Sequence, residues 1–378
     1  MSKKPSGTVL IVGASGLVGT AAARAFAEAG WSILTASRRS PELLHDLETV
    51  HLALDLKDAV ACRDAASKLQ NVTHVVYAAV HELPGLMPGW SDPEQIQTNA
   101  AMLENLLVPL AEAAQLQHVT LLQGTKAYGA AIGPIRIPAR ESQPRVDHPN
   151  FYWRHEDFIR EQSARCGYSF TILRPQLIVG PNHGVVMNLP PVIGAYAALR
   201  HYEGLPFAFP GGADWVWEAA DVRLVGRACL WAAIEPGARG ETYNLTNGEV
   251  FTWRDMWPVL AETLGVSSAP DESLSIANYL GERTELWQDV VRRYDLQPIE
   301  LPTLLGESHH YTDLCFNYGS QAAPPPTFVS TVKIRQAGFN DAVNTEESFC
   351  HWLADLQARR VLPSREQLLA ARGADPGS

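Results

Sequence analysis

The chain has 378 residues, more than one average domain and enough for a nucleotide-binding half joined to a smaller substrate-binding half. Its formal net charge of −11 argues against nucleic acid or an anionic membrane surface as the main partner. Its five cysteines form no CxxC pair and show no metal-ligand spacing with the histidines, so we expect no metal site and a reducing compartment.

The N-terminal residues 1–7 are short and polar, and they do not resemble a signal peptide. No apolar stretch approaches the roughly 20 residues that span a bilayer. The nearest is residues 189–199, which proline and glycine interrupt. We therefore expect a soluble, cytoplasmic protein with no membrane partner.

The first predicted element is a strand that runs through a glycine turn into a helix. Residues 9–12 are apolar, residues 13–19 read Gly-Ala-Ser-Gly-Leu-Val-Gly, and the alanine-rich residues 20–29 predict a helix. This order aims the backbone N–H groups of a helix N-terminus at a pyrophosphate with no side chain in the way. An ordinary turn is the alternative, because glycines mark turns too. We predict a dinucleotide-binding turn made by Gly13, Ser15, Gly16, Leu17 and Gly19.

The residues after the second predicted strand, 31–36, indicate which dinucleotide binds. Ser37, Arg38 and Arg39 stand where an NAD site normally places an acidic residue for the ribose 2′-hydroxyl. Guanidinium groups offer bidentate hydrogen bonds to a 2′-phosphate. Arg38 and Arg39 therefore favour NADPH, and a solvated basic turn is the alternative.

The third and fourth predicted strands contribute the adenosine side of the site. Residues 50–54 are followed by Asp55 and Leu56, which we expect at the adenine edge. Residues 74–78 are followed by Ala79, whose small side chain would let the backbone approach the cofactor.

Strands and helices continue to alternate through the first 180 residues. We expect an Asn-led helix at 99–114, a strand at 118–122, a helix after Tyr152 and a strand at 169–173. Such alternation predicts an α/β fold with a Rossmann-like, doubly wound parallel sheet. Residues 1–180, with 220–250 contributing, would form the NADP-binding part, and residues 181–370 an interleaved and mainly substrate-binding region.

Hydride transfer with a nicotinamide needs a group that stabilises the oxygen on which negative charge develops. Short-chain dehydrogenases usually supply it from a Tyr-x-x-x-Lys pair on one helix. No tyrosine of this chain has a lysine at that offset, and the residue four positions after Tyr152 is Glu156. The cation would have to come from elsewhere in the chain.

Two motifs carry a resemblance to a known family. Residues 123–129 read Gln-Gly-Thr-Lys-Ala-Tyr-Gly, and residues 150–157 read Asn-Phe-Tyr-Trp-Arg-His-Glu-Asp. The chain resembles the enone reductases related to progesterone 5β-reductase and iridoid synthase, a divergent branch of the extended short-chain dehydrogenases. In that family a lysine in a Thr-Gly-x-Lys-x-Tyr loop replaces the helix lysine. This chain departs from the family at Trp153, where a second tyrosine is usual, and in the reversed order of Gly124 and Thr125.

The resemblance implies a reduction of the C=C bond of an α,β-unsaturated carbonyl by NADPH. Tyr152 would hydrogen-bond the carbonyl oxygen as it becomes an enolate, and the charge of Lys126 would assist it. A tyrosine packed against the sheet and a solvated lysine are the plain alternatives. The resemblance also implies a small-molecule enone as partner and a possible homodimer, and further cofactor contacts at Gln123, Tyr152, Ile178, Val185, Val186 and Met187.

Two other functions remain open on the same fold. One is a carbonyl reductase or hydroxysteroid-type dehydrogenase, in which Tyr152 would donate its proton to an alkoxide. The other is a non-catalytic NADP sensor, which the loss of Tyr-x-x-x-Lys favours and the presence of Lys126 opposes.

Overall fold

A computed structural model of the protein describes residues 7–370. Seven strands form its main sheet in the order β11-β6-β5-β4-β1-β2-β3, and every neighbouring pair is parallel. The expected doubly wound α/β sheet is therefore confirmed. The strands are β1 (Thr8–Val12), β2 (Ser32–Ser37), β3 (Thr49–Ala53), β4 (His74–Tyr77), β5 (His118–Leu122), β6 (Ser169–Pro175) and β11 (Glu241–Leu245).

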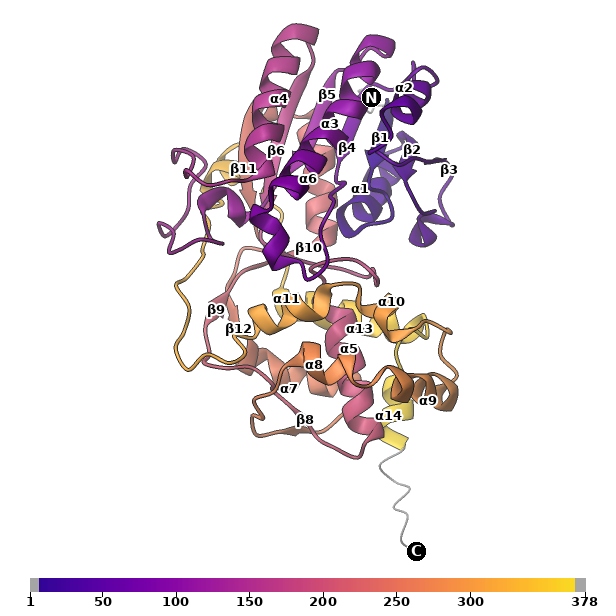
Figure 1. The fold of residues 1–378 in the computed structure, drawn as a ribbon, viewed down its shortest axis with the longest axis vertical. Helices are drawn as coiled ribbons and strands as arrows, with labels where there is room; N and C mark the ends of the chain where they lie inside the picture. The colour runs from indigo at the N-terminus through magenta and orange to yellow at the C-terminus, as the bar shows by residue number, and fades with distance from the viewer. Residues whose placement is uncertain (1–6, 371–378) are drawn as a thin grey trace, which may run out of the picture.

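Helices cover both faces of this sheet, as the upper half of Figure 1 shows. The side chains of β1 alternate: Val9 and Ile11 pack with α1 and α6, and Leu10 and Val12 pack with the other three helices. A strand buried on both faces reads as a continuous apolar run, as β1 does. The helices are α1 (Leu17–Glu28), α2 (Ala59–Ala66), α3 (Pro93–Ala113), α4 (Phe151–Cys166) and α6 (Val222–Ile234).

The strand order reverses between β1 and β4. The chain proceeds outward from β1 to β3, returns to place β4 on the other side of β1, and continues through β5 and β6. Val12, the last residue of β1, has Ala36 and Tyr77 as its partners on the two flanking strands. Ligands of open α/β sheets bind beyond the carboxyl ends of the strands at such a reversal.

Helix α3 begins earlier than the sequence pattern indicated. It starts at Pro93, because the Asp92 side chain accepts hydrogen bonds from the backbone N–H groups of Glu94 and Gln95. Proline at the first helical position has no N–H to leave unpaired. Asn99, which we expected near the helix start, lies two turns inside the helix and is fully buried.

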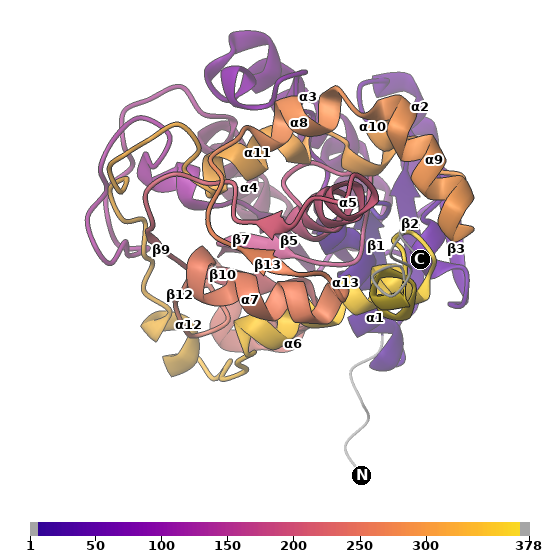
Figure 2. The same ribbon diagram turned by 90° about the horizontal axis from the view of Figure 1, so that it is seen from below.

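The lower half of the molecule is mostly helical and has its own apolar core. Seen from below, α5 lies between a row formed by α8, α9 and α10 and the pair α7 and α13 (Figure 2). Trp253, Trp257 and Trp287 are buried in this core. The helices are α5 (Leu189–Tyr202), α7 (Trp253–Leu264), α8 (Ile276–Gly281), α9 (Thr284–Tyr294), α10 (Leu301–Leu305), α11 (Ser308–Cys315), α13 (Thr345–Ala358) and α14 (Arg365–Ala370).

The two halves are interleaved along the chain. After β6, the short strand β7 (Leu177–Val179) pairs with β10 (Ala219–Asp221), which leads directly into α6 against the sheet. Much later, α12 (Val332–Gln336) returns to pack on β11. Smaller two-stranded pairs join β8 (Phe207–Ala208) to β13 (Ser268–Ala269) and β9 (Val216–Trp217) to β12 (Phe251–Thr252). Within residues 7–370, no helix is long and apolar enough to cross a membrane.

Candidate active site

The glycine turn after β1 has the geometry that a bound pyrophosphate requires. Gly13 has a φ of +83°, and a Cβ on it would lie 2.8 Å from the backbone nitrogen of Ala79. A Cβ on Gly19 would lie 2.3 Å from the carbonyl oxygen of Gly13. Gly16 caps α1 with no side chain over the helix N-terminus. The turn, the neighbouring strand end and the helix therefore approach each other as closely as glycine permits.

An asparagine from the second half of the chain fastens this turn. Asn182 Nδ2 donates to the Ser15 carbonyl oxygen at 3.3 Å and to Thr20 Oγ1 at 3.1 Å. Asn188, fully buried, donates in turn to the carbonyl oxygen of Asn182 at 2.6 Å. The sequence analysis gave neither asparagine a role. The partners of Asn182 are more than 160 residues away in sequence, and those of Asn188 are backbone atoms of its own loop.

The predicted cofactor-covering loop, with Val185, Val186 and Met187, is half-buried and tied to α11. Ser308 Oγ, at the start of α11, donates to the Val185 carbonyl oxygen at 2.6 Å and accepts from Asn188 N at 3.0 Å. Met187 has a φ of +60°. Ile178 lies in β7, half-buried, opposite Ala220 of β10.

The predicted adenosine side lies at the ends of β2 and β3. Arg38, Arg39 and Asp55 are exposed, and neither arginine forms an ion pair with a carboxylate in the described part of the chain. We expected Leu56 at the adenine edge, but its side chain is buried in the core between the sheet, α2 and α3. Only its backbone can face the crevice.

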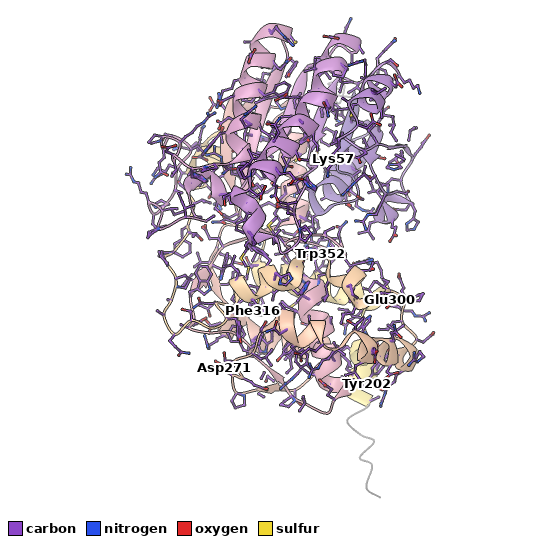
Figure 3. The ribbon with its side chains drawn as sticks, viewed as in Figure 1. Lys57, Tyr202, Asp271, Glu300, Phe316 and Trp352 are labelled. Atoms are coloured by element: carbon purple, nitrogen blue, oxygen red, sulfur yellow. The ribbon has the colours of Figure 1, made fainter. Side chains whose placement is uncertain are left out.

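Lys57 adds a cation that sequence reasoning missed. It lies on the upper half of the molecule in Figure 3, and its Nζ is 3.5 Å from His81 Nε2. Burial lowers the pKa of His81, and the charges of Lys57 and Arg38 lower it further. The ends of β2, β3 and β4 thus carry three basic side chains close enough to affect one another.

Tyr152 is positioned by the start of α4. Asn150 caps the helix by accepting a hydrogen bond from Tyr152 N at 3.0 Å, and its amide donates to the Lys126 carbonyl oxygen at 3.3 Å. A Cβ on Gly124 would lie 3.6 Å from the Tyr152 hydroxyl oxygen. The hydroxyl therefore lies close to Gly124, beyond the carboxyl end of β5.

Lys126 lies in a short 3-10 helix at Thr125–Tyr128, directly after β5. Its Nζ is 5.8 Å from the centroid of the Tyr152 ring and 4.2 Å from that of Trp90. The structure thus brings together the two residues predicted to be catalytic. The lysine side chain is only 15% exposed, and burial lowers the pKa of its ammonium group.

A buried carboxylate accompanies this lysine. Glu82 Oε1 lies 3.8 Å from Lys126 Nζ, and Glu82 Oε2 accepts a hydrogen bond from Gln95 Nε2 at 2.5 Å. Burial raises the pKa of Glu82, and Lys126 opposes that shift. Sequence reasoning missed Glu82, which lies in a loop far from both motifs.

The side chain of Gln123 is hydrogen-bonded to the first turn of α4, the helix that carries Tyr152. It donates to the Tyr152 carbonyl oxygen at 3.3 Å and accepts from Arg174 Nε at 2.9 Å. Arg174 also lies 3.7 Å from Glu156. Glu156 is buried, with Arg145 and Arg160 as further partners. Both polar atoms of the Gln123 side chain are therefore engaged within the protein.

Tyr311 of α11 approaches Tyr152 from the lower half. Burial raises the pKa of the Tyr311 hydroxyl far above its usual range, and the nearby Tyr152 and Cys315 add to the shift. Burial likewise raises the pKa of Tyr152, and Glu82 adds to this shift whereas Arg174 opposes it. Tyr152 is therefore protonated at neutral pH and can donate a hydrogen bond, whereas the Tyr311 hydroxyl has Cys315 as a side-chain hydrogen-bond partner.

A cavity of about 500 Å³ lies elsewhere, between α1, α6 and α13. Its walls include Leu17, Thr20, Val222 and Trp352, and neither Lys126 nor Tyr152 lines it. Trp352 lies where the two halves meet (Figure 3). This cavity therefore does not include the pair of Tyr152 and Lys126.

The chain is similar to known proteins over nearly its whole length. Residues 9–246 match the model of the NAD dependent epimerase/dehydratase family. The chain is 27% identical to (S)-8-oxocitronellyl enol synthase of Catharanthus roseus, with 96% of this chain and 94% of that protein covered. It is 28% identical to 3-oxo-Delta(4,5)-steroid 5-beta-reductase of Arabidopsis thaliana, with 94% and 92% covered.

Solved structures share the fold at lower identity. The UDP-glucose 4-epimerase from Bifidobacterium longum, in complex with NAD+ and UDP, matches with a TM-score of 0.64 and 14% identity over 94% of this chain and 99% of that chain. The Bordetella bronchiseptica enzyme WbmH, in complex with NAD+, matches with a TM-score of 0.62 and 15% identity over 93% and 98%. These matches concern the fold alone.

Proposed function

The chain belongs to the NAD dependent epimerase/dehydratase family and is an oxidoreductase of the extended short-chain type, and we propose that it reduces the C=C bond of α,β-unsaturated carbonyl compounds with NADPH. The observation that carries the proposal is the placement of Lys126, which reaches Tyr152 from the loop after β5 and not from the tyrosine's own helix. The named enol synthase and steroid reductase add support as relatives.

A dinucleotide would bind beyond the carboxyl ends of the strands, where the strand order reverses. In the turn at Gly13–Gly19, the backbone N–H groups of Ser15 and Leu17 would bind a pyrophosphate, whereas Gly16 N–H donates to the Gly13 carbonyl oxygen at 3.0 Å and holds the turn in shape. The guanidinium groups of Arg38 and Arg39, which form no ion pair with a carboxylate of residues 7–370, suit a 2′-phosphate and so favour NADPH over NADH. Ala79, Asp55 and the Leu56 backbone would border the adenosine, and Ile178, Gln123 and the loop at 185–187 the nicotinamide end.

When bound, the reduced nicotinamide supplies a hydride for the β-carbon of the substrate. The chain's own residues handle the carbonyl oxygen. Tyr152, kept protonated by burial, donates a hydrogen bond to that oxygen and stabilises the enolate as negative charge develops on it. The ammonium of Lys126 stabilises the same charge from a short distance. Solvent then protonates the α-carbon, and the saturated carbonyl compound leaves.

Identification of the product tests this proposal. The purified protein is incubated with NADPH and a panel of linear, cyclic and steroidal enones, and the products are examined by NMR. A saturated ketone or aldehyde supports conjugate reduction. An allylic alcohol would assign the protein to the carbonyl reductases instead, and tight NADPH binding without any product would favour a sensor.

A further inference from the structure

The environment of Lys126 contains a feature that the proposed reaction does not by itself require. Glu82 is only 4% exposed, yet its Oε1 has no hydrogen-bond partner among the described residues and faces Lys126 Nζ at 3.8 Å. A buried carboxylate is costly unless it is paired. A carboxylate that is buried beside a buried cation, at the edge of the crevice, must therefore affect what the cation can do.

The position of Glu82 is built by the first turns of α3. Gln95 donates from Nε2 to Glu82 Oε2 at 2.5 Å and accepts from Leu83 N at 2.7 Å through its Oε1. Asn99 binds the backbone on the other side of Glu82, accepting from His81 N and donating to the His81 carbonyl oxygen, both at 2.8 Å. Gln95 and Asn99 are themselves fully buried. The carboxylate is held on a rigid support and cannot swing out to solvent.

Each charged group that acts on Tyr152 has a neighbour of opposite charge. Two charged groups act on its hydroxyl, Glu82 and Arg174. Arg174 is paired with Glu156 at 3.7 Å, and Glu82 with Lys126. The remaining neighbours of the Lys126 ammonium are the rings of Trp90 and Tyr152, and Tyr311 faces Tyr152 as a neutral phenol. The positive charge closest to Tyr152 on this side, that of Lys126, is therefore balanced by Glu82.

We propose that Glu82 is a positioning residue that fixes Lys126 and balances its charge, so that the site selects uncharged unsaturated aldehydes and ketones over unsaturated carboxylates. The inference rests on the proposed reductase function for its substrate class. Without Glu82, the charge of Lys126 would attract the carboxylate group of a ligand before any reaction. That carboxylate would then occupy the place of the substrate carbonyl group. With Glu82 beside it, the lysine meets negative charge mainly when the enolate forms, and that is the interaction that accelerates a reaction.

The test compares a charged and an uncharged probe that share a six-membered ring, the first on the NADP⁺-loaded protein and the second with NADPH. Calorimetry measures the binding of 1-cyclohexene-1-carboxylate, and steady-state kinetics measure the reduction of 2-cyclohexen-1-one. Glu82→Gln should bind the carboxylate at least about tenfold more tightly than the wild type, since a charge within about 4–6 Å shifts such equilibria by one to three logarithmic units. The same variant should lose activity on the ketone, and the alkaline limb of its kcat/KM profile should move to lower pH. A general loss of structure would weaken both ligands and so cannot imitate this result.

Lys126→Met gives the reverse change, in case Glu82→Gln does not fold. It leaves Glu82 unpaired, so carboxylate binding should weaken at least about tenfold below that of the wild type. Glu272→Gln, which removes a carboxylate paired with Arg200 far from the crevice, should leave both probes unchanged. Unaltered or weaker carboxylate binding in a folded Glu82→Gln would overturn the inference. If the wild type reduces no enone, the proposed function is wrong. The calorimetric comparison still tests the role of Glu82 in that case, because it needs no turnover.

Discussion

The nucleotide turn and the catalytic corner of this protein are built in opposite ways. The turn at Gly13–Gly19 is continuous in sequence, and its ligand groups are backbone atoms made accessible by the absence of side chains. The corner is assembled from side chains of separate segments, Glu82 before α3, Lys126 after β5 and Tyr152 on α4, with Tyr311 from the lower half. The first is a local property of the chain, whereas the second exists only once the sheet has formed. Substitutions should therefore affect the two regions differently.

Removing the catalytic groups should give the largest effect. Tyr152→Phe and Lys126→Met each take away a group that acts on the developing oxyanion, so kcat on a good enone should fall by roughly 10²–10⁴-fold. The affinity for NADPH, measured by fluorescence quenching, should stay within a few-fold of the wild type. Lys333→Met, which removes a lysine paired with Glu241 on the sheet edge, is the matched control and should keep its activity. Equal losses in all three variants would mean that the corner is not catalytic.

The glycine turn should respond through cofactor binding. Gly19→Ala places a methyl group 2.3 Å from the Gly13 carbonyl oxygen, so the helix must move away from the turn. Overpacking of this kind costs about 1–3 kcal/mol. We expect the affinity for NADPH to fall by the factor that corresponds to this free energy. The Tm of the variant should be lower than that of the wild type. Gly133→Ala, where nothing lies within 4 Å of the new methyl group, should be silent.

Cofactor selectivity should depend on the arginines and on a residue outside the turn. Arg38→Ala and Arg39→Ala should each raise the KM for NADPH roughly tenfold, because a hydrogen bond to a charged group is worth about 1.5–3 kcal/mol. The KM for NADH should change little. Lys57→Ala should weaken NADPH by a smaller factor, since its contribution would come from charge rather than from a bidentate contact. Selectivity for NADPH that survives the double arginine variant would refute this assignment.

The smallest effect concerns stability against pH and leaves both regions intact. Burial lowers the pKa of His74 to about 4 and that of His118 to about 3, below the ordinary value of 6.5. The unfolded chain therefore binds these protons first as the pH falls. The contribution of these two histidines to the free energy of unfolding should be constant above about pH 6.5 and should decline as the pH falls from 6.5 to about 3. His118→Gln should flatten this decline in urea titrations, and an unchanged slope would show that other groups cause it.

The same contrast explains how much the sequence could predict. The sheet, the glycine turn and the partnership of Lys126 with Tyr152 were predictable, because a strand-turn-helix pattern is local and the two motifs carried a family resemblance. Glu82, Asn182 and Tyr311 were not, because each reaches its partner across the fold and its neighbours in sequence give no sign of it. Leu56 shows a second limit, since adjacent residues of one loop can face opposite directions. The early start of α3 reflects the capping strength of Asp92, which the pattern of apolar residues does not reveal.

The return of the chain to its sheet has a consequence for how such an enzyme could diversify. Because β7 pairs with β10, β11 closes the sheet edge after residue 240, and α12 packs on β11 nearly ninety residues later, the chain crosses between the two halves repeatedly. No single cut separates a cofactor module from a substrate module. New substrate ranges in this architecture are therefore reached by replacing loops within a continuous chain, and recombination that exchanges one half would need several compatible joints at once.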